Sequence, residues 1–160
     1  MSEPNVMRVG VRDVRFGERV TIVEPVNLYG CAIGDDTFVG PYVEIQASAT
    51  VGKRCRIQSH SFVCELVGIG DDCVIAHGVI FTNDKFAFGG PARGNKALWK
   101  STRVGNRVSI GSGATILPVS ICDGVVIGAG AVVTKDITRP GVYAGNPARF
   151  LKESPAPPAK

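Results

Sequence analysis

The sequence has little of what would place it in several common protein classes. It holds only two histidines, and its five cysteines form no C-x-x-C pair, so neither a zinc ribbon nor a disulfide scaffold is expected. No apolar run approaches the roughly 18 residues of a membrane helix, and no signal peptide is apparent. The net charge of +4 comes without a dense Lys/Arg stripe, which argues against nucleic-acid binding. We therefore expect a soluble, cytoplasmic protein with buried, reduced thiols.

Apolar residues instead recur at every sixth position over much of the chain. Glycine often follows the apolar residue directly, and a small residue stands four positions after it. The first run is Ile33, Val39, Ile45, Val51, Ile57, Val63, Ile69, Ile75 and Phe81. The spacing resumes at Val104, Ile110 and Ile116, slips by one residue, and continues at Ile121, Ile127 and Val133.

A period of six fits neither a single strand nor a helix, and it indicates a solenoid of hexapeptide repeats. Three hexads of short strands and corners close one triangular coil of about 18 residues, and stacked coils pair as parallel strands. The large aliphatic residue fills the interior, and the glycine beside it is expected to permit an unusual backbone shape. We predict an all-β fold, a parallel β-helix prism over residues 1–150, followed by a tail at 151–160.

This pattern resembles the left-handed β-helix of the hexapeptide-repeat acyltransferases over about residues 9–150. The left-handedness is implied by the resemblance alone, as are a homotrimer and an acyl-CoA bound between neighbouring prisms. The string VVTKDITRPGVYAGNPARFLK (132–152) is similar to the closing coil and terminal helix of that family. The resemblance therefore implies a short C-terminal helix.

Three shorter strings narrow the resemblance. EPVNLYGC (24–31), IQSHSFVCE (57–65) and HGVIFTND (77–84) resemble bacterial nucleotide-sugar 3-amino N-acetyltransferases. Such enzymes use acetyl-CoA to acetylate the amino group, here expected at C3, of a nucleotide-linked amino sugar for surface polysaccharides such as lipopolysaccharide. The resemblance also implies that backbone amides around Gly130 and Ala131 bind the pantetheine, and that Lys135 and Arg149 lie near the CoA phosphates.

The hexads are interrupted at about residues 84–103. This segment contains the single tryptophan, two phenylalanines and several Lys/Arg residues. Long loops inside compact repeats are more often functional than not, although solenoids also tolerate surface insertions. We expect the inserted loop to flank the substrate or cofactor groove and to reach an adjacent subunit.

Glu65 and Asn83 stand 18 positions apart, so they should lie one above the other at one corner of the prism. A carboxylate beside an amide suits a protonated amine, because it supplies a counter-charge and a hydrogen-bond acceptor. Asp84, the last residue of the HGVIFTND string, joins them as a substrate-binding candidate. An ordinary solvent-exposed polar corner is the alternative interpretation.

The two histidines are the candidates for proton transfer. His77 projects at a corner and could act as a general base, since imidazole accepts a proton near neutral pH. His60, nearly above it on the preceding coil, is a weaker candidate for the base. We expect it to bind substrate, with structural hydrogen bonding as the alternative. Solvent or the departing CoA sulfur could also take the proton, so we expect Asn83 to matter more than His77.

Three other functions are compatible with a prism of this type. A metal-dependent hydratase like the γ-class carbonic anhydrases needs three histidine ligands, and this chain has only two, so we predict no metal site. A sugar O-acetyltransferase and a non-catalytic β-solenoid binding protein both remain open.

Overall fold

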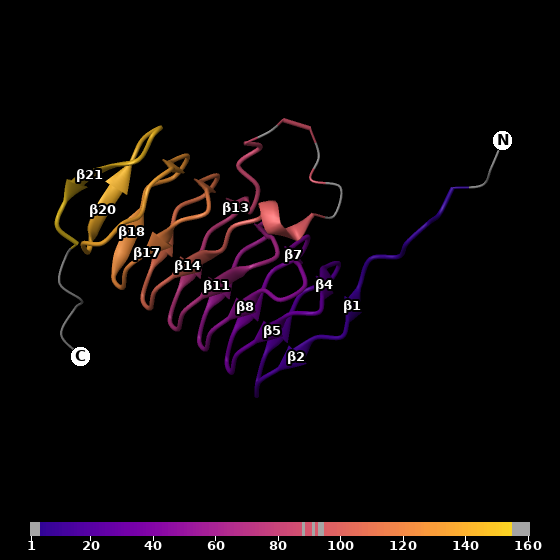
Figure 1. Cartoon of the computed structure of the whole chain (residues 1–160). Coiled ribbons are helices and arrows are strands. Elements are labelled where there is room, and N and C mark those ends of the chain that lie inside the picture. Colours follow the sequence, from indigo (N-terminus) through magenta and orange to yellow (C-terminus); the bar gives the residue numbers. More distant parts are fainter. Residues whose placement is uncertain (1–3, 88, 91, 93–94, 155–160) are drawn as a thin grey trace.

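The chain winds into a β-solenoid whose short strands stack into three sheets (Figure 1). The computed structural model describes residues 4–87, 89–90, 92 and 95–154. From β1 to β19, successive strands along the chain enter sheets A, B and C in turn, so each complete coil of the prism contributes one strand to each sheet. Pairing within the three sheets is parallel, apart from the last strand of sheet C. The predicted parallel prism is confirmed, and its left-handedness stays a prediction.

The strands are two to four residues long. Sheet A contains β1 (Val11–Arg12), β4 (Asn27–Tyr29), β7 (Glu44–Ile45), β10 (Phe62–Val63), β13 (Ile80–Phe81), β16 (Thr115–Ile116) and β19 (Val132–Val133). Sheet B contains β2 (Arg15–Phe16), β5 (Ala32–Ile33), β8 (Thr50–Val51), β11 (Val67–Ile69), β14 (Thr102–Val104) and β17 (Ser120–Ile121). Sheet C contains β3 (Thr21–Ile22), β6 (Phe38–Val39), β9 (Arg56–Ile57), β12 (Val74–Ile75), β15 (Ser109–Ile110), β18 (Val125–Ile127), β20 (Gly141–Ala144) and β21 (Arg149–Lys152).

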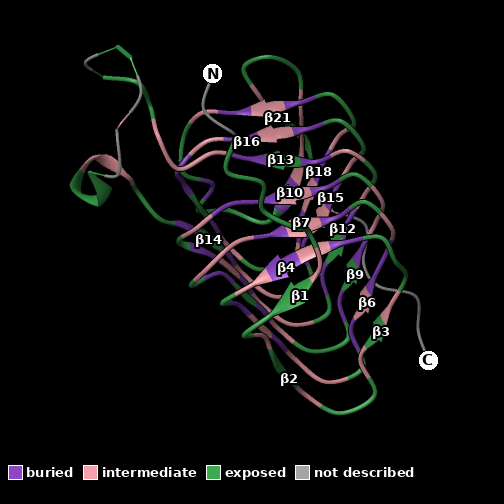
Figure 2. Cartoon of the chain, turned by 90° about the vertical axis from the view of Figure 1, so that its right-hand side faces the viewer, coloured by how far each residue is buried: buried purple, intermediate pink, exposed green. Residues whose placement is uncertain are grey.

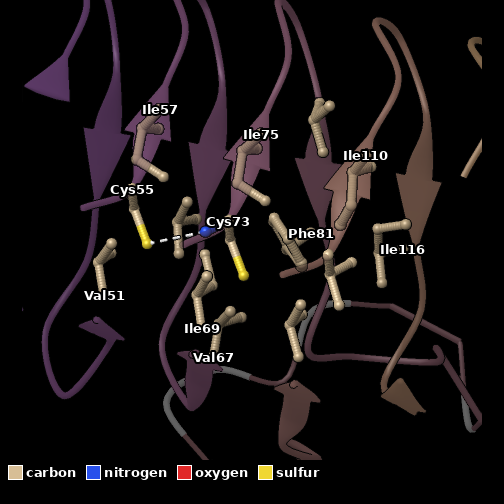
Figure 3. Packing of buried hydrophobic residues seen from close by; sticks show 14 of the residues in the cluster. Val51, Cys55, Ile57, Val67, Ile69, Cys73, Ile75, Phe81, Ile110 and Ile116 are labelled. Atoms are coloured by element: carbon tan, nitrogen blue, oxygen red, sulfur yellow. Dashed lines mark hydrogen bonds between the residues drawn. The ribbon is translucent and has the colours of Figure 1, made fainter. Parts of the chain in front are cut away.

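The core is made of the residues that carry the repeat. Every predicted interior position from Ile33 to Val133 is at most 5% exposed. Ile33 pairs with Val51, and Val51 pairs with Ile69, so successive coils are in the predicted register (Figure 3). Each coil thus buries three aliphatic or aromatic side chains between the sheets, and hydrophobic burial along the prism axis stabilises the fold.

All five cysteines are free thiols, as expected, and four of them are buried. Cys55 and Cys73 stack on neighbouring coils, where the Cys73 backbone N–H donates to Cys55 Sγ at 3.4 Å (Figure 3). The contact with Cys55 and, after it, burial raise the pKa of the Cys73 thiol. Cys73 therefore packs as a small neutral residue in the core.

The inserted loop leaves the prism after β13 and returns at β14. Ile69 pairs directly with Val104, so the coils continue in register across the insertion. The described part of the loop is mostly exposed and contains one short 3₁₀ helix, η1 (Lys96–Leu98) (Figures 1 and 2). The predicted insertion is confirmed as an excursion from one edge of the stack.

Glycine is required beside the core aliphatic residues for a different reason from the one expected. A Cβ on Gly52 would lie 2.6 Å from the backbone of Gly70 and 2.4 Å from Asp71 Oδ1. A Cβ on Gly70 would likewise lie 2.6 Å from Asn106 Oδ1. The constraint is the close approach of consecutive coils, because these glycines do not occupy the left-handed backbone region.

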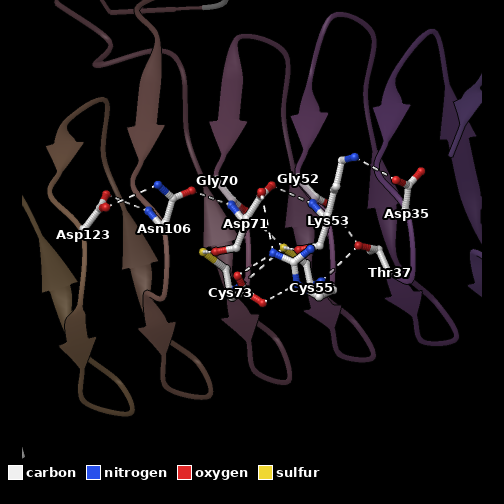
Figure 4. Close-up of polar contacts among 12 residues, drawn as sticks. Asp35, Thr37, Gly52, Lys53, Cys55, Gly70, Asp71, Cys73, Asn106 and Asp123 are labelled. Carbon is white, nitrogen blue, oxygen red and sulfur yellow. Dashed lines mark hydrogen bonds and ion pairs between the residues drawn. The ribbon is translucent and has the colours of Figure 1, made fainter. Parts of the chain in front are cut away.

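A ladder of side chains fastens the coils along the edge where sheet B turns into sheet C (Figure 4). Asp71 accepts from the Lys53 backbone N–H at 2.8 Å, and Asn106 accepts from the Asp71 backbone N–H at 2.8 Å. Asp123 accepts from the Asn106 backbone N–H at the same distance. Each carboxylate or amide thus pairs a turn N–H of the coil before it, which would otherwise lack a protein partner.

The expected C-terminal helix is wrong for the residues that the structure describes there. Arg149–Lys152 forms β21, which pairs antiparallel with β20 and closes the last coil. Phe150 packs edge-on against Tyr143 with ring centroids 5.5 Å apart, and Arg139 lies 4.7 Å above the Phe150 ring. These contacts require an extended strand that brings Phe150 back over Tyr143. Residues 155–160 of the predicted tail lie outside the described residues.

Candidate functional site

Most of the predicted site residues lie along two edges that flank sheet A, whereas Lys135 and Arg149 lie at the end of the prism. The A–B edge is formed by the turns that leave sheet A, and it carries Glu65, Asn83 and Asp84. The C–A edge is formed by the turns that enter sheet A, and it carries His60 and His77. Sheet A separates the two sets of residues within one chain.

The A–B edge contains a cavity of about 470 Å³ beneath the inserted loop. Aromatic side chains from sheet A and from the loop form much of its wall, including Tyr29, Phe62 and Trp99. Glu65 and Asn83 line the same cavity, which confirms that the two residues meet at one corner. The cavity thus combines aromatic surface with one carboxylate and one amide.

Asn83 is fixed in place at this edge. The side-chain Nδ2 of Asn83 donates to the backbone carbonyl of Glu65 at 3.3 Å, and the backbone carbonyl of Asn83 accepts from the Lys100 backbone N–H at 2.8 Å. The side-chain Oδ1 is then the remaining acceptor of the amide. Asp84 also lines the cavity, and its Oδ1 accepts from the Phe86 backbone N–H at 2.7 Å in a local turn.

Two residues next to Glu65, one of which lines the cavity, were missed from the sequence. Lys96 of η1 forms an ion pair with Glu65, with Nζ 2.7 Å from Oε2. Cys64 lines the cavity and is 2% exposed, and its burial raises the pKa of the thiol to about 11. Cys64 could have been found from the sequence, because it directly precedes Glu65. Lys96 could not, because it lies in a loop whose residues the six-residue repeat does not position.

The two histidines on the C–A edge do not stack on each other. His77 is exposed, and its Nδ1 lies 3.1 Å from Ser59 Oγ, the residue one coil below it. His60 instead stacks on Tyr42, with ring centroids 4.9 Å apart and planes at 25°. When Nδ1–H donates to Ser59, the Nε2 atom of His77 is free to accept a proton.

The C–A edge also carries a bare strip of backbone. Gly78, Gly113 and Gly130 occupy the same turn position on successive coils, with φ of +66°, +69° and +67°, and open space surrounds each. Tyr42 and His60 occupy this position on earlier coils with φ of 60° and 64°. The turn therefore tolerates large side chains, and their absence from this strip allows a ligand to approach the backbone closely.

The expected backbone donors at Gly130 and Ala131 are already bonded within the solenoid. The Gly130 N–H donates to Ser112 O at 2.9 Å, and the Ala131 N–H donates to Gly128 O at 3.3 Å. The Ala131 side chain is completely buried in the core. Gly130 can therefore offer an open surface to a ligand, but neither of these two N–H groups is free to bind one.

Lys135 and Arg149 come together at the end of the prism. Both are exposed and line a cavity of about 340 Å³ between the last coil and the closing hairpin of β20 and β21. Asp136 also lines this cavity, but its Oδ1 accepts from the Ser120 backbone N–H at 2.8 Å. Two cationic side chains around one cavity provide a suitable environment for phosphate groups.

Comparison with known families agrees with this architecture. The family profile described as "Bacterial transferase hexapeptide (six repeats)" matches residues 30–65. A second profile, described as "Hexapeptide repeat of succinyl-transferase", matches residues 49–83 and 101–135, on either side of the inserted loop. The chain belongs to the hexapeptide-repeat transferases.

Curated relatives of this hexapeptide-repeat protein include the bifunctional protein GlmU of Acidithiobacillus ferrooxidans. The two are 30% identical over 164 residues, which cover 88% of this chain and 36% of GlmU. GlmU of Baumannia cicadellinicola is 36% identical over 110 residues, which cover 68% of this chain and 21% of that protein. The chain thus spans about a third or less of the length of these relatives.

Solved structures show the same fold at low sequence identity. A mutant of AntD, an N-acyltransferase from Bacillus cereus in complex with dTDP and coenzyme A, gives a TM-score of 0.78 at 22% identity, covering 88% of this chain and 84% of AntD. PerB from Caulobacter crescentus, in complex with CoA and GDP-perosamine, gives 0.54 at 20% identity, covering 88% and 57% of the two chains. At these identities the likeness concerns the fold.

Among the described residues, no three His, Cys, Asp or Glu side chains are grouped as a metal site requires. In the same part of the chain, no helix has the length and apolar character needed to span a bilayer.

Proposed function

We propose that the chain is an acetyl-CoA-dependent N-acetyltransferase that acts on the amino group, at C3, of a nucleotide-linked amino sugar. The observation that carries the proposal is the pairing of Glu65 with the anchored amide of Asn83 in an aromatic-lined cavity. AntD and PerB, which share the fold, were solved with coenzyme A and with dTDP or GDP-perosamine. The sequence resemblance to 3-amino N-acetyltransferases motivates the choice of C3 and of surface polysaccharides as the destination.

Glu65 and Asn83 have complementary roles in this proposal. Glu65 attracts the protonated amine, and Asn83 Oδ1 accepts an N–H hydrogen bond that aims the nitrogen at the thioester. The amine must lose one proton to become nucleophilic. The nitrogen then attacks the thioester carbonyl, the C–N bond forms and the C–S bond breaks, giving the amide, CoA and one released proton. Positioning is the main contribution of the site to the rate.

Two groups can take the proton. His77 is one, because its contact with Ser59 leaves Nε2 available in one tautomer. The departing CoA sulfur is the other, and it needs no protein base. Cys64 is excluded from this role, because a thiol whose pKa is raised to about 11 is a neutral, weak nucleophile near pH 7.

Coenzyme A is proposed to lie along the bare strip of the C–A edge. Gly113 and Gly130 leave the backbone open on the late coils, where the pantetheine would pass. The cavity of Lys135 and Arg149 lies on the same late coils and would hold the phosphates. In this placement the pantetheine contacts the open surface at Gly130. The hydrogen bonds that were expected from the Gly130 and Ala131 N–H groups are not part of it.

A homotrimer would unite the two edges. Three prisms that turn sheet A toward a common axis would bring the A–B edge of one copy against the C–A edge of its neighbour. His77 and Asn83 follow successive strands of one coil, β12 and β13, so they would meet at matching heights. The outer face of sheet A includes Ile80, which is 45% exposed in the single chain and would gain from burial. The sites would then lie between subunits.

A second candidate is a sugar O-acetyltransferase. A hydroxyl is a weaker nucleophile than an amine and needs a base, and the contact between His77 and Ser59 favours this reading. A maltose O-acetyltransferase from Clostridium difficile shares the fold, with a TM-score of 0.56 at 27% identity over 88% of this chain and 71% of that one. Glu65 argues against this candidate, because a neutral hydroxyl gives the carboxylate no counter-charge.

The proposal is tested by measuring thiol release from acetyl-CoA with a panel of nucleotide-linked amino and hydroxy sugars. Turnover with a 3-amino sugar, and little with its 3-hydroxy counterpart, is the expected result. Turnover confined to hydroxy sugars would establish the second candidate. No thiol release with any member of the panel, from protein that binds CoA, would contradict both.

The location of CoA is tested by Gly130→Tyr. The side chain should fill the bare strip and abolish CoA binding, measured by calorimetry, while Tyr42 shows that the turn accepts this residue. Gly124→Tyr is the matched control, because Gly124 has φ of +70° and open space but lies on the edge between sheets B and C. Equal CoA affinity in the two variants would mean that CoA does not bind along the C–A edge.

A further inference from the structure

Lys96 occupies the place that the proposed substrate's amine would take. Its Nζ lies 2.7 Å from Glu65 Oε2, and the Glu65 side chain is only 15% exposed while that of Lys96 is 65% exposed. A carboxylate this far withdrawn from water needs a cationic partner. In the described structure Lys96 supplies that partner from the inserted loop, 31 residues further along the chain.

Anchoring of the loop does not depend on this ion pair. The loop is already fastened to the prism by the Lys100 N–H, which donates to Asn83 O at 2.8 Å. Within η1, Asn95 caps the helix by accepting from the Ala97 N–H at 3.2 Å. Lys96 therefore contributes a charge to the cavity, held on a long and mostly solvated side chain that can swing away.

We propose that Lys96 is an exchangeable counter-ion of Glu65 that selects for an amine and helps to expel the product. It pairs with Glu65 while the site is empty, and the ammonium group of the substrate displaces it. This inference rests on the proposed function and extends it. One ammonium replaces another in the exchange, so Glu65 stays paired throughout.

The exchange distinguishes the three ligands that the site would meet. A sugar hydroxyl is neutral and cannot replace Lys96, so a hydroxy sugar would leave the ion pair in place and be blocked by it. Once the amine has been acetylated, the amide product is also neutral and no longer compensates Glu65. Lys96 then returns to the carboxylate and competes with the product for the site. Selection against hydroxyls and product release thus follow from one ion pair.

Trp99 provides a direct reporter of the exchange. It is the only tryptophan in the chain, and Lys96 Nζ lies 5.6 Å from its ring centroid. Withdrawal of the ammonium from the indole should change the Trp99 fluorescence. The signal requires no turnover, so it can be read even if the protein transfers no acetyl group.

The first experiment titrates the protein with three probes and records Trp99 fluorescence. The probes are a dTDP-linked 3-amino sugar, its 3-hydroxy counterpart and its N-acetylated form. We expect a change with the amine that the two neutral probes do not produce, and we expect this difference to vanish in Lys96→Met. An equal response to all three probes, or a difference that persists in Lys96→Met, would overturn the proposal.

The second experiment compares the kinetics of Lys96→Met with those of Lys100→Met, a lysine of the same loop that lies outside the ion pair with Glu65. Removal of the competing ammonium should lower KM for the amino sugar roughly two- to fivefold, the size expected of a partly exposed ion pair. The inhibition constant of the N-acetylated product should fall by a similar factor. Lys96→Arg and Lys100→Met should both behave as the unmodified protein.

The two experiments separate this inference from the proposed function. If Lys96 only braced the loop, Lys96→Met would raise KM and lower the melting temperature without tighter product inhibition, and the counter-ion role would be wrong although the enzyme works. An amine-specific Trp99 response in a protein that releases no thiol would retain the counter-ion and reject the acetyltransferase.

Discussion

At the scale of single residues, Asn83 is the most constrained polar side chain of the proposed site. Its Nδ2 is held by the Glu65 carbonyl, so Oδ1 has a fixed direction. We predict that Asn83→Ala lowers kcat/KM by about 100-fold or more, because lost orientation is costly in acyl transfer. His77→Asn should retain more activity, since the CoA sulfur can take the proton.

Both variants should be assayed over pH with circular dichroism as the check on folding. If His77 contributes as a base, His77→Asn should flatten the pH profile of kcat/KM relative to that of the unmodified protein. Near-normal activity in Asn83→Ala beside an inactive His77→Asn would reverse the ranking and make the histidine the essential group.

The sequence predicts residue positions well wherever the repeat sets them. The 18-residue separation placed Glu65 beside Asn83 because both follow a core aliphatic at the same distance. The same rule was too coarse for His60, which is one position out of line with His77 and stacks on Tyr42. Lys96 could not be predicted, because its contact with Glu65 depends on a loop path that no periodicity describes.

At the scale of elements, the stacked glycines set how closely two coils approach. A Cβ on Gly52 would meet Asp71 Oδ1 at 2.4 Å and the Gly70 backbone at 2.6 Å. We predict that Gly52→Ala lowers the free energy of unfolding by roughly 1–3 kcal/mol, as overpacking does in rigid cores. Urea unfolding followed by circular dichroism measures the change.

Gly68→Ala is the control for this prediction. Gly68 also lies within the stack, on β11, but its added Cβ would meet the nearest atom, Thr50 Oγ1, at 3.5 Å, which is an ordinary contact. Its stability should stay within about 0.5 kcal/mol of the unmodified protein. Equal effects at the two positions would mean that coil spacing is not what requires glycine at Gly52.

The elements that the sequence predicted poorly are those outside the hexads. Strand positions followed directly from the six-residue spacing, because each buried aliphatic marks one short strand. The C-terminal string was expected to end in a short helix, yet its last residues form β21, because Phe150 packs against Tyr143 across the hairpin. This contact joins two segments that carry no repeat, so the six-residue spacing does not predict it.

At the scale of the whole molecule, the proposed site is divided between the two edges of sheet A. The carboxylate and amide lie on the A–B edge, whereas His77 and the bare strip lie on the C–A edge. The repeat predicted that these residues lie at corners of the prism, but it did not distinguish the A–B edge from the C–A edge. For this reason the sequence predicted a single site. Within one chain they cannot converge, so the proposed chemistry requires a second copy.

Mixed oligomers test whether two chains share each site. Asn83→Ala impairs the A–B edge, and Gly130→Tyr impairs the C–A edge, so each homo-oligomer should be inactive or nearly so. Chains carrying the two substitutions are co-expressed with different tags, and the mixed species is purified by both tags. Every cyclic trimer that contains both chains has one site in three with two intact halves, so the activity of the doubly purified species should recover toward about a third.

The matched control mixes two variants of one edge. Asn83→Ala and Glu65→Ala both impair the A–B edge. A trimer mixed from these two variants therefore has no site with an intact A–B half. This pair should therefore stay inactive in the mixed trimer, although its subunits assemble equally well by light scattering. Recovery in neither mixture would place both halves of the site within one chain and remove the reason for the trimer. Recovery in the control as well would mean that Glu65 and Asn83 do not belong to the same half of the site.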